Sequence, residues 1–372
     1  MSARTSGNPL VRLGELGQSP WYDFITRDLV TSGELARLIA EDGLLGMTTN
    51  PTIFEKAVAG SSLYDADIRR LTALDKSPAE IFEALAVADV RAACDLFHAV
   101  YERTRGQDGL VSIEVSPTLA NDTEGTVQEA ERLWAAVDRP NAMIKIPGTE
   151  AGLPAITRCI ADGINVNVTL LFSVERYQAV IRAHEAGLEL RAKQGLPLAG
   201  VASVASFFVS RVDSKIDPLL DRIGDPDHLR GRIAIANACM AYRTFERWVT
   251  NPRWELLAAR GAQQQRPLWA STSTKDPAYA DVHYVEALVA PHTVNTLPPE
   301  TFAAYRDHGQ PAVRIHAGIA AAEGQLAALE RRGIDLRAVT QELEVEGVKK
   351  FVQSYESLLG AIEGKMEALT PQ

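Results

Sequence analysis

Eight short apolar stretches alternate with helical stretches along most of this 372-residue chain, and this alternation constrains the fold more than any other feature. Repeated strand–helix units are typical of a parallel sheet, because two parallel strands need a crossover connection that is usually a helix. The expected strands cover residues 21–25, 44–49, 110–117, 143–148, 164–171, 202–210, 267–273 and 292–297.

Apolar residues spaced three and four apart predict helices between and after these strands. Thr31 or Ser32 is the expected cap of the first helix. The expected helices cover residues 33–41, 53–105, 126–137, 153–161, 174–194, 214–223, 229–260, 311–331 and 348–369.

Eight strands of this kind predict an α/β fold that closes into a (β/α)8 TIM barrel with additional helices. An open doubly wound sheet is the alternative, but no glycine-rich turn of the nucleotide-binding type follows any of the strands. We expect one domain over residues 1–372. Residues 1–19 are expected to be a loose lead-in, and the helices of about 300–372 are expected to pack on the barrel.

The composition excludes several classes of partner. The net charge is −10, and no cluster of Lys and Arg is present, so neither nucleic acid nor an anionic membrane surface is an expected partner. No apolar run is long enough to cross a membrane. The three cysteines are scattered and predict neither a disulfide framework nor a zinc site. We expect a cytoplasmic protein, either a monomer or a homodimer, that acts on small molecules.

The fourth expected strand carries Lys145 inside an apolar run. A strand covered on both faces admits a charge only if the charge is paired, is neutralised or faces a polar cavity. One interpretation of Lys145 is a packed aliphatic stem whose ammonium reaches water. The other is a desolvated amine that attacks carbonyl groups, because burial disfavours the ammonium and leaves neutral amine to form a Schiff base.

Polar residues on the other strands help to decide between the two interpretations of Lys145. Alternate residues of each strand face the interior of a closed barrel, and barrel enzymes react at the C-terminal mouth. A network that only fixed the packing would bury an Asp, a Glu and a Lys together, at a cost of several kcal/mol for each unpaired ion. The pattern therefore favours a catalytic mouth. The residues expected to point into it are Asp23, Asn50, Glu114, Lys145, Asn167, Thr169 and Ser206.

Four short motifs resemble the signature strands of transaldolase: TTNPT at 48–52, SIEV at 112–115, IKIP at 144–147 and INVNVTLLF at 164–172. The resemblance runs from about Trp21 to Leu297, and GVKKF at 347–351 is also similar. The extra helical length in 229–260 and in the last seventy residues resembles the longer bacterial branch of the family.

The resemblance implies roles for four catalytic residues. Lys145 corresponds to the lysine that forms the Schiff base with a ketose. Asp23 corresponds to the carboxylate that takes and returns the proton of a sugar hydroxyl. Glu114 and Thr169 correspond to the pair that activates the catalytic water.

The resemblance also implies the substrate contacts. Asn50 and Asn167 match side chains that hold the hydroxyls of dihydroxyacetone, and Ser206 and Arg211 match phosphate contacts. Shorter members of the family have a second phosphate-binding arginine after the seventh strand, where this chain has Lys275. Lys275 is expected to replace it as a point charge without the bidentate fork. The other interpretation of Lys275 is a solvated loop lysine.

The implied activity transfers a dihydroxyacetone unit from sedoheptulose 7-phosphate to glyceraldehyde 3-phosphate, which gives erythrose 4-phosphate and fructose 6-phosphate in the non-oxidative pentose phosphate pathway. A class I aldolase that releases dihydroxyacetone is one alternative, and an inactive barrel that serves as a binding protein is another. Phe208 favours transfer, because a phenyl ring offers no proton to the enamine. No cofactor or metal is expected, because the iminium is the electron sink and the histidines lack metal-site spacing.

Overall fold

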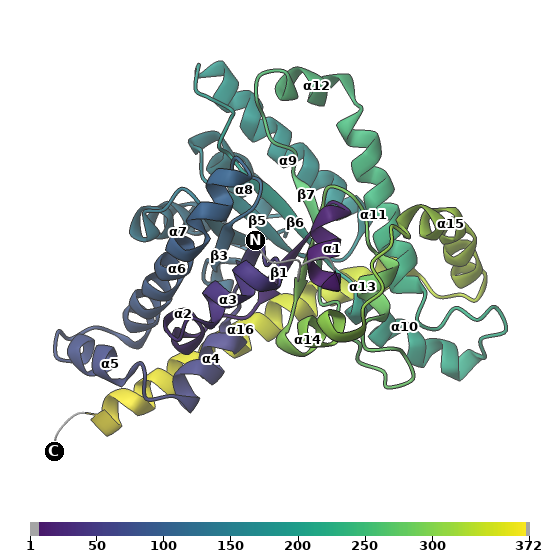
Figure 1. Cartoon of the computed structure of the whole chain (residues 1–372). Coiled ribbons are helices and arrows are strands. Elements are labelled where there is room, and N and C mark those ends of the chain that lie inside the picture. The colour runs from purple at the N-terminus through teal and green to yellow at the C-terminus, as the bar shows by residue number, and fades with distance from the viewer. Residues whose placement is uncertain (1–6, 370–372) are drawn as a thin grey trace.

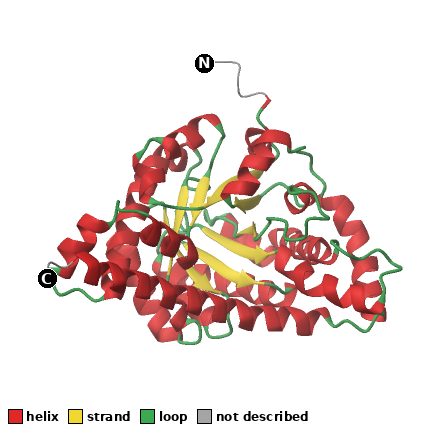
Figure 2. Ribbon diagram, turned by 90° about the horizontal axis from the view of Figure 1, so that it is seen from below, coloured by secondary structure: helices red, strands yellow, loops and turns green. Residues whose placement is uncertain are grey.

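A computed structural model of the chain describes residues 7–369 and contains a closed barrel of eight parallel strands. The strands follow one another around the barrel in sequence order, and β8 pairs with β1 to close it. Figure 2 shows the strands at the centre of the molecule with helices around them. The predicted (β/α)8 barrel is confirmed, and the open doubly wound alternative is wrong.

All eight predicted strands are present, although their ends differ from the expected ones. The first strand begins earlier than expected because residues from Gln18 onward pair with β8. The strands are β1 Gln18–Asp23, β2 Gly46–Thr48, β3 Leu110–Glu114, β4 Ala142–Pro147, β5 Val166–Leu171, β6 Ser203–Phe208, β7 Arg266–Ala270 and β8 Thr293–Leu297.

The helices surround the barrel, and none within residues 7–369 is long and apolar enough to span a membrane. The helices are α1 Pro9–Glu15, α2 Arg27–Thr31, α3 Glu34–Glu41, α4 Pro51–Gly60, α5 Asp65–Thr72, α6 Pro78–Arg103, the 3-10 helix η2 Pro117–Leu119, α7 Thr123–Val137, α8 Gly152–Asp162, α9 Val174–Lys193, α10 Ser210–Ile223, α11 Ile233–Val249, α12 Pro252–Ala258, α13 His283–Ala287, α14 Pro299–His308, α15 Ile315–Arg331 and α16 Leu336–Leu369.

Two of the expected helices are divided by capping signals. The region 53–105 forms α4, α5 and α6, and α6 starts at a capping box in which Ser77 and Glu80 bond each other's backbone N–H groups. The region 229–260 forms α11 and α12, and Asn251 caps α12 ahead of Pro252. Long helical periodicity therefore predicted the helical state but not these breaks.

The lead-in expected over residues 1–19 is not loose where the structure describes it, and this expectation is wrong. Residues 9–15 form α1, which buries Leu10 and Leu13 completely. Asn8 caps the helix by accepting from Leu10 N at 3.0 Å, and its amide donates to the Asp42 carboxylate at 2.9 Å. Residues 1–6 lie outside the described residues.

The last helix, α16, lies along the barrel and packs against α4, α5, α6, α10 and β5 (Figure 1). Gly347 permits this approach, since a Cβ atom there would lie 3.1 Å from Leu170 Cδ2 on β5. One turn later, Phe351 reaches the C-terminal mouth of the barrel and joins its wall. A helix from the end of the sequence thus completes a site that the strands begin.

A buried ion pair occupies the opposite, N-terminal end of the barrel. Arg266 Nη2 lies 2.9 Å from Asp108 Oδ1, and both side chains are only 10% exposed. Asp108 also accepts hydrogen bonds from the hydroxyl of Ser19 at 2.9 Å and the indole of Trp21 at 3.2 Å. Gly46 makes room for that indole, because a Cβ atom there would lie 2.4 Å from it. Removing one ion of such a pair leaves the other buried and uncompensated.

Replacing Asp108 by alanine is therefore expected to lower the free energy of unfolding by about 3–5 kcal/mol, as measured by urea denaturation. Asp95 is the matched control, since its carboxylate pairs with Arg139 at 2.5 Å on the surface. Asp95→Ala should leave stability almost unchanged because water and salt screen exposed pairs. Equal losses in the two variants would contradict a special role for the buried pair.

Candidate active site

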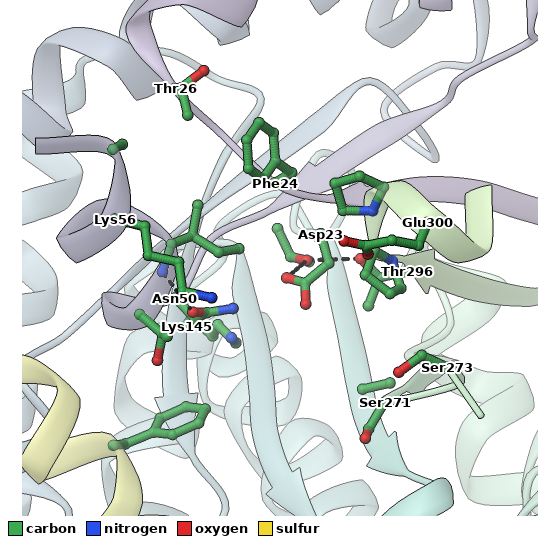
Figure 3. A pocket seen from close by; sticks show the side chains of 18 of the residues that line it. Asp23, Phe24, Thr26, Asn50, Lys56, Lys145, Ser271, Ser273, Thr296 and Glu300 are labelled. Atoms are coloured by element: carbon green, nitrogen blue, oxygen red, sulfur yellow. Dashed lines mark hydrogen bonds between the residues drawn. The ribbon is translucent and has the colours of Figure 1, made fainter. Parts of the chain in front are cut away.

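A cavity of about 650 Å³ opens at the C-terminal ends of the strands. Figure 3 shows its side chains converging from several strands and from α4. Seven of the nine predicted site residues line this cavity, whereas Glu114 lines a neighbouring cavity that shares Asn50 with it, and Asn167 is fully buried. The seven are Asp23, Asn50, Lys145, Thr169, Ser206, Arg211 and Lys275.

Lys145 lies at the floor of the cavity, on β4, in which every residue is buried. Its side chain is 6% exposed, so the ammonium does not extend into bulk water as a surface lysine would. Lys145 Nζ donates a hydrogen bond to the carbonyl of Thr49 at 3.0 Å and lies 5.6 Å from the ring centroid of Phe351. The amine is therefore held in a largely dry place beside an aromatic face.

Glu114 is the neighbour of Lys145 in the sheet register, and its Oε2 lies 3.7 Å from Lys145 Nζ. Burial raises the pKa of Glu114 to about 7; the ammonium of Lys145 opposes this shift and the charge of Asp23 adds to it. Neither carboxylate oxygen has a hydrogen-bond partner among the described residues. Glu114 is thus a buried acid whose pKa suits proton transfer near neutral pH.

A β-bulge on β5 places Thr169. The register between β5 and β6 shifts between Val168 and Leu171, and Leu170 adopts a left-handed φ of 61°. The hydroxyl of Thr169 is buried without a hydrogen-bond partner in the described part of the chain, as are the oxygens of Glu114. Strict alternation predicted that Thr169 faces inward, but it did not predict the bulge that sets its direction.

Asp23 ends β1 and is held by the hydroxyl group of Thr48, which in turn contacts the hydroxyl group of Thr296. Thr48 Oγ1 donates to Asp23 Oδ1 at 2.8 Å, and the Thr48 and Thr296 hydroxyls lie 2.7 Å apart. Figure 3 shows Asp23 facing the same space as Asn50 and Lys145. Asp23 and Lys145 therefore both line the mouth, and Glu114 lies beside Lys145 outside that lining.

The two predicted asparagines take different positions. Asn50 caps α4 by accepting from Ile53 N at 3.1 Å, which leaves its side-chain amide for the cavity that it lines. Asn167 is fully buried beneath the cavity, where it donates to Ser112 Oγ at 3.0 Å and accepts from Ser206 Oγ at 2.7 Å. Asn167 is also the register partner of Lys145, so its hydrogen bond connects Ser206 to the strand position beside Lys145.

Two cations form the other end of the cavity. Arg211 is half-buried on α10, and its guanidinium carbon lies 5.2 Å from the ring centroid of Phe208. Burial lowers the pKa of Arg211, and the charge of Asp23 opposes this shift. Burial lowers the pKa of Lys275 as well, and the positive charge of Arg211 lowers it further. Two cations that line the same cavity favour an anionic ligand between them.

Sequence reasoning missed residues that reach this site from other elements. Thr48 and Thr296 were not selected, although Thr48 lies within the motif at 48–52 and shares the inward face of its strand with Gly46. Phe351 also lies within a noted motif, at 347–351, but a helical pattern does not reveal which strand a distant helix will cover. Lys56 of α4 lines the cavity and carried no signal of its own.

The described residues 7–369 contain no group of three or more His, Cys, Asp or Glu side chains placed to hold a metal ion. The thiols of Cys94, Cys159 and Cys239 are buried and unpaired. Burial raises the pKa of Cys159 and Cys239 to about 12, so these thiols remain protonated at neutral pH. None of the three thiols lines the cavity, whereas the amine of Lys145 does.

Comparison with known proteins agrees with this geometry. Residues 20–362 match the family described as transaldolase/fructose-6-phosphate aldolase. The chain is 48% identical to a transaldolase of Trichodesmium erythraeum, with 98% of this chain and 99% of that protein covered. It is 50% identical to a transaldolase of Acidothermus cellulolyticus and 49% identical to one of Frankia alni, with at least 95% of each chain covered.

Removal of the Lys145 ammonium gives a test of the electrostatics. A nearby cation stabilises a carboxylate, so Lys145→Met should raise the pKa of Glu114 above its value of about 7 and leave the acid largely protonated at pH 7. Infrared difference titration can follow the carboxylic acid band, and the band absent from Glu114→Gln identifies it. An unchanged or lower pKa would show that the two groups are not coupled.

Proposed function

The chain belongs to the transaldolase/fructose-6-phosphate aldolase family, and from this we infer that it is a transaldolase. It transfers a dihydroxyacetone unit from sedoheptulose 7-phosphate to glyceraldehyde 3-phosphate, which gives erythrose 4-phosphate and fructose 6-phosphate. The observation that carries the mechanism is the buried amine of Lys145, 3.7 Å from a carboxylate at the floor of the mouth.

The reaction begins when the neutral amine of Lys145 attacks the ketose carbonyl. The carbinolamine that forms then loses water to give a protonated imine, which is an electron sink. The neighbouring carboxylic acid of Glu114 protonates the leaving hydroxyl, and the carboxylate that remains compensates the positive charge of the imine. Its pKa of about 7 lets it exist in both protonation states during turnover.

Carbon–carbon cleavage requires a base on the hydroxyl of the carbon that leaves as the aldehyde. Asp23 faces Lys145 across the mouth and serves as this base. As it takes the hydroxyl proton, the aldehyde product forms, and the electrons of the broken bond move into the imine to give an enamine. Thr48 keeps the carboxylate in place through its 2.8 Å hydrogen bond.

Transfer requires that the enamine survive until the acceptor aldehyde arrives. Phe208 lines the cavity and presents a ring without an acidic proton, so it cannot protonate the enamine carbon. When the acceptor binds, the enamine attacks its aldehyde carbon, and Asp23 returns the proton to the new hydroxyl. Glu114 and Thr169, whose buried oxygens lack protein partners, then hold and activate the water that hydrolyses the imine.

The two ends of the cavity bind different parts of the sugar phosphate. Asn50, Asn167 and Ser206 surround the Lys145 end and hold the hydroxyls of the three-carbon unit. Arg211 and Lys275 bind the phosphate, and Lys275 acts there as a point charge. This assignment moves Ser206 from the phosphate group, where the resemblance placed it, to the hydroxyl group.

The three buried, unpaired thiols are typical of a reducing compartment, and we infer a cytoplasmic location from them. The prediction of a monomer or homodimer stays open to measurement by ultracentrifugation.

Borohydride reduction with fructose 6-phosphate should attach a three- or six-carbon adduct to Lys145, located by peptide mass mapping. Lys145→Ala should lose the adduct and at least a thousandfold of the turnover number, of the order seen when a covalent nucleophile is removed. Lys56→Ala is the matched control, since Lys56 lines the same cavity from α4 and should leave the adduct intact. An adduct on another lysine, or normal turnover by Lys145→Ala, would refute the mechanism.

Arg211→Ala should raise the KM for fructose 6-phosphate roughly 10- to 100-fold, the range expected when hydrogen bonds to a charged group are lost. Trapping of unphosphorylated fructose on Lys145 should change little, because fructose has no phosphate group for Arg211 to bind. Arg222, an exposed arginine at the far end of the same helix, is the control. Equal losses for both sugars would contradict a phosphate role.

A further inference from the structure

Lys275 lies in the segment 271–282, which connects β7 to α13 and forms no helix or strand. Its Nζ donates to Ser273 Oγ at 2.5 Å, a contact inside the same segment. A connection of this kind has no ladder of backbone hydrogen bonds to fix it, so contacts with neighbouring elements must set where its side chains lie. The position of Lys275 relative to Arg211 therefore depends on what holds the segment.

The segment packs beside α10, the helix that carries Arg211. Ser210, Asp213 and Asp217 follow one another at spacings of three and four and so share one side of α10. Ser210 N donates to the carbonyl of Ser271 at 3.0 Å, where the segment begins. Asp213 accepts from Tyr284 on α13 at 3.0 Å, just beyond its end. One side of α10 thus contacts both ends of the segment.

Asp217 holds the middle of the segment. It is 5% exposed, and its Oδ2 accepts a hydrogen bond from the hydroxyl of Tyr279 at 2.7 Å, while its Oδ1 accepts from Gly231 N at 3.1 Å. The ring of Tyr279 stacks on His283, with 5.3 Å between centroids, and His283 in turn bonds the carbonyl of Gly231 at 2.8 Å. A carboxylate this deeply buried requires such partners, yet no step of the reaction uses it.

We propose that Tyr279 and Asp217 are positioning residues that fix the separation of Arg211 and Lys275, and that they thereby determine the preference of the enzyme for phosphorylated sugars. The proposal rests on the proposed function, because it concerns the phosphate end of the same cavity. Tyr279 lies four residues after Lys275, and Asp217 lies six residues after Arg211 on its helix. The hydrogen bond therefore connects the two cations through short, direct lengths of chain.

The energetic reason lies in the like charges of the two cations. Arg211 and Lys275 line the same cavity, and the charge of Arg211 adds to burial in lowering the pKa of Lys275; without a phosphate, this repulsion favours movement of the segment away from α10. The Tyr279–Asp217 bond opposes this movement and keeps both cations in the lining of the cavity. A preorganised pair binds the anion more tightly because less ordering accompanies binding.

Tyr279→Phe removes only the hydroxyl and tests the proposal. Half-saturation of borohydride trapping on Lys145 should require about three- to tenfold more fructose 6-phosphate, while the concentration required for fructose should not change. The maximal amount of adduct should be the same with either sugar. Equal changes for the two sugars, or no change for fructose 6-phosphate, would overturn the proposal. Absence of any Lys145 adduct in the unaltered protein would instead refute the proposed function.

A double-variant cycle separates positioning from a general effect on the fold. If Tyr279 acts through Lys275, Tyr279→Phe should cause no further loss of fructose 6-phosphate affinity in a Lys275→Met background. If each substitution instead lowers the affinity for fructose 6-phosphate by the same factor whether or not the other is present, Tyr279 does not act through Lys275, and the proposal is overturned.

Tyr242→Phe is the matched control. Its hydroxyl is likewise held in the interior, where it donates to the carbonyl of Pro291 at 3.1 Å, away from the segment 271–282. In this variant, half-saturation of trapping should require the same concentration of each sugar as in the unaltered protein. A selective loss of fructose 6-phosphate affinity in Tyr242→Phe as well would overturn the assignment to Tyr279.

Discussion

Pairing of β8 with β1 is the constraint on which the rest of the structure depends. Once both edges of the sheet are joined, every second side chain of each strand must enter a common interior, whatever its polarity. The polar residues there are ordered along the axis: the Arg266–Asp108 pair lies at the N-terminal end, the Asn167 network lies above it, and the charged groups face the mouth. The barrel therefore concentrates reactive groups at one end and satisfies the others below them.

Burial away from water makes the pair of Lys145 and Glu114 chemically useful. Burial alone would make the ionised forms of Lys145 and Glu114 costly, and their separation of 3.7 Å offsets part of that cost without a full hydrogen bond. The same burial raises the pKa of Glu114 to about 7, where one carboxyl group can give and accept a proton within a single turnover. Phe351 covers the amine from α16, so the final helix contributes to the dryness on which the chemistry depends.

The alternation of polar and apolar residues was sufficient to predict which strand positions face inward, and Asp23, Lys145 and Thr169 lie in the cavity for that reason. Periodicity gives the face of a strand and not the depth along the barrel axis, so it did not distinguish Ser206, which lines the cavity, from Asn167, which is fully buried. Asn167 is the register partner of Lys145, and it accepts a hydrogen bond from Ser206 at 2.7 Å. The helix over residues 9–15 was missed because a short segment with glycine and proline on either side looks like a loop when its packing partners are unknown.

The sequence by itself determined the eight strands, their inward faces, and an amine with two carboxylates at one end of a barrel, because these follow from periods of two and 3.6 residues that are local properties of the chain. Only the tertiary structure decided how those groups are aimed. Local periodicity does not show which distant segments will meet, or in which register. Four features of the site depend on this: the bulge that turns Thr169, the hydroxyl of Thr48 on Asp23, the ring of Phe351 over Lys145 and the bond from Tyr279 to Asp217. Such contacts exist only after closure and packing have fixed the distances between distant parts of the chain.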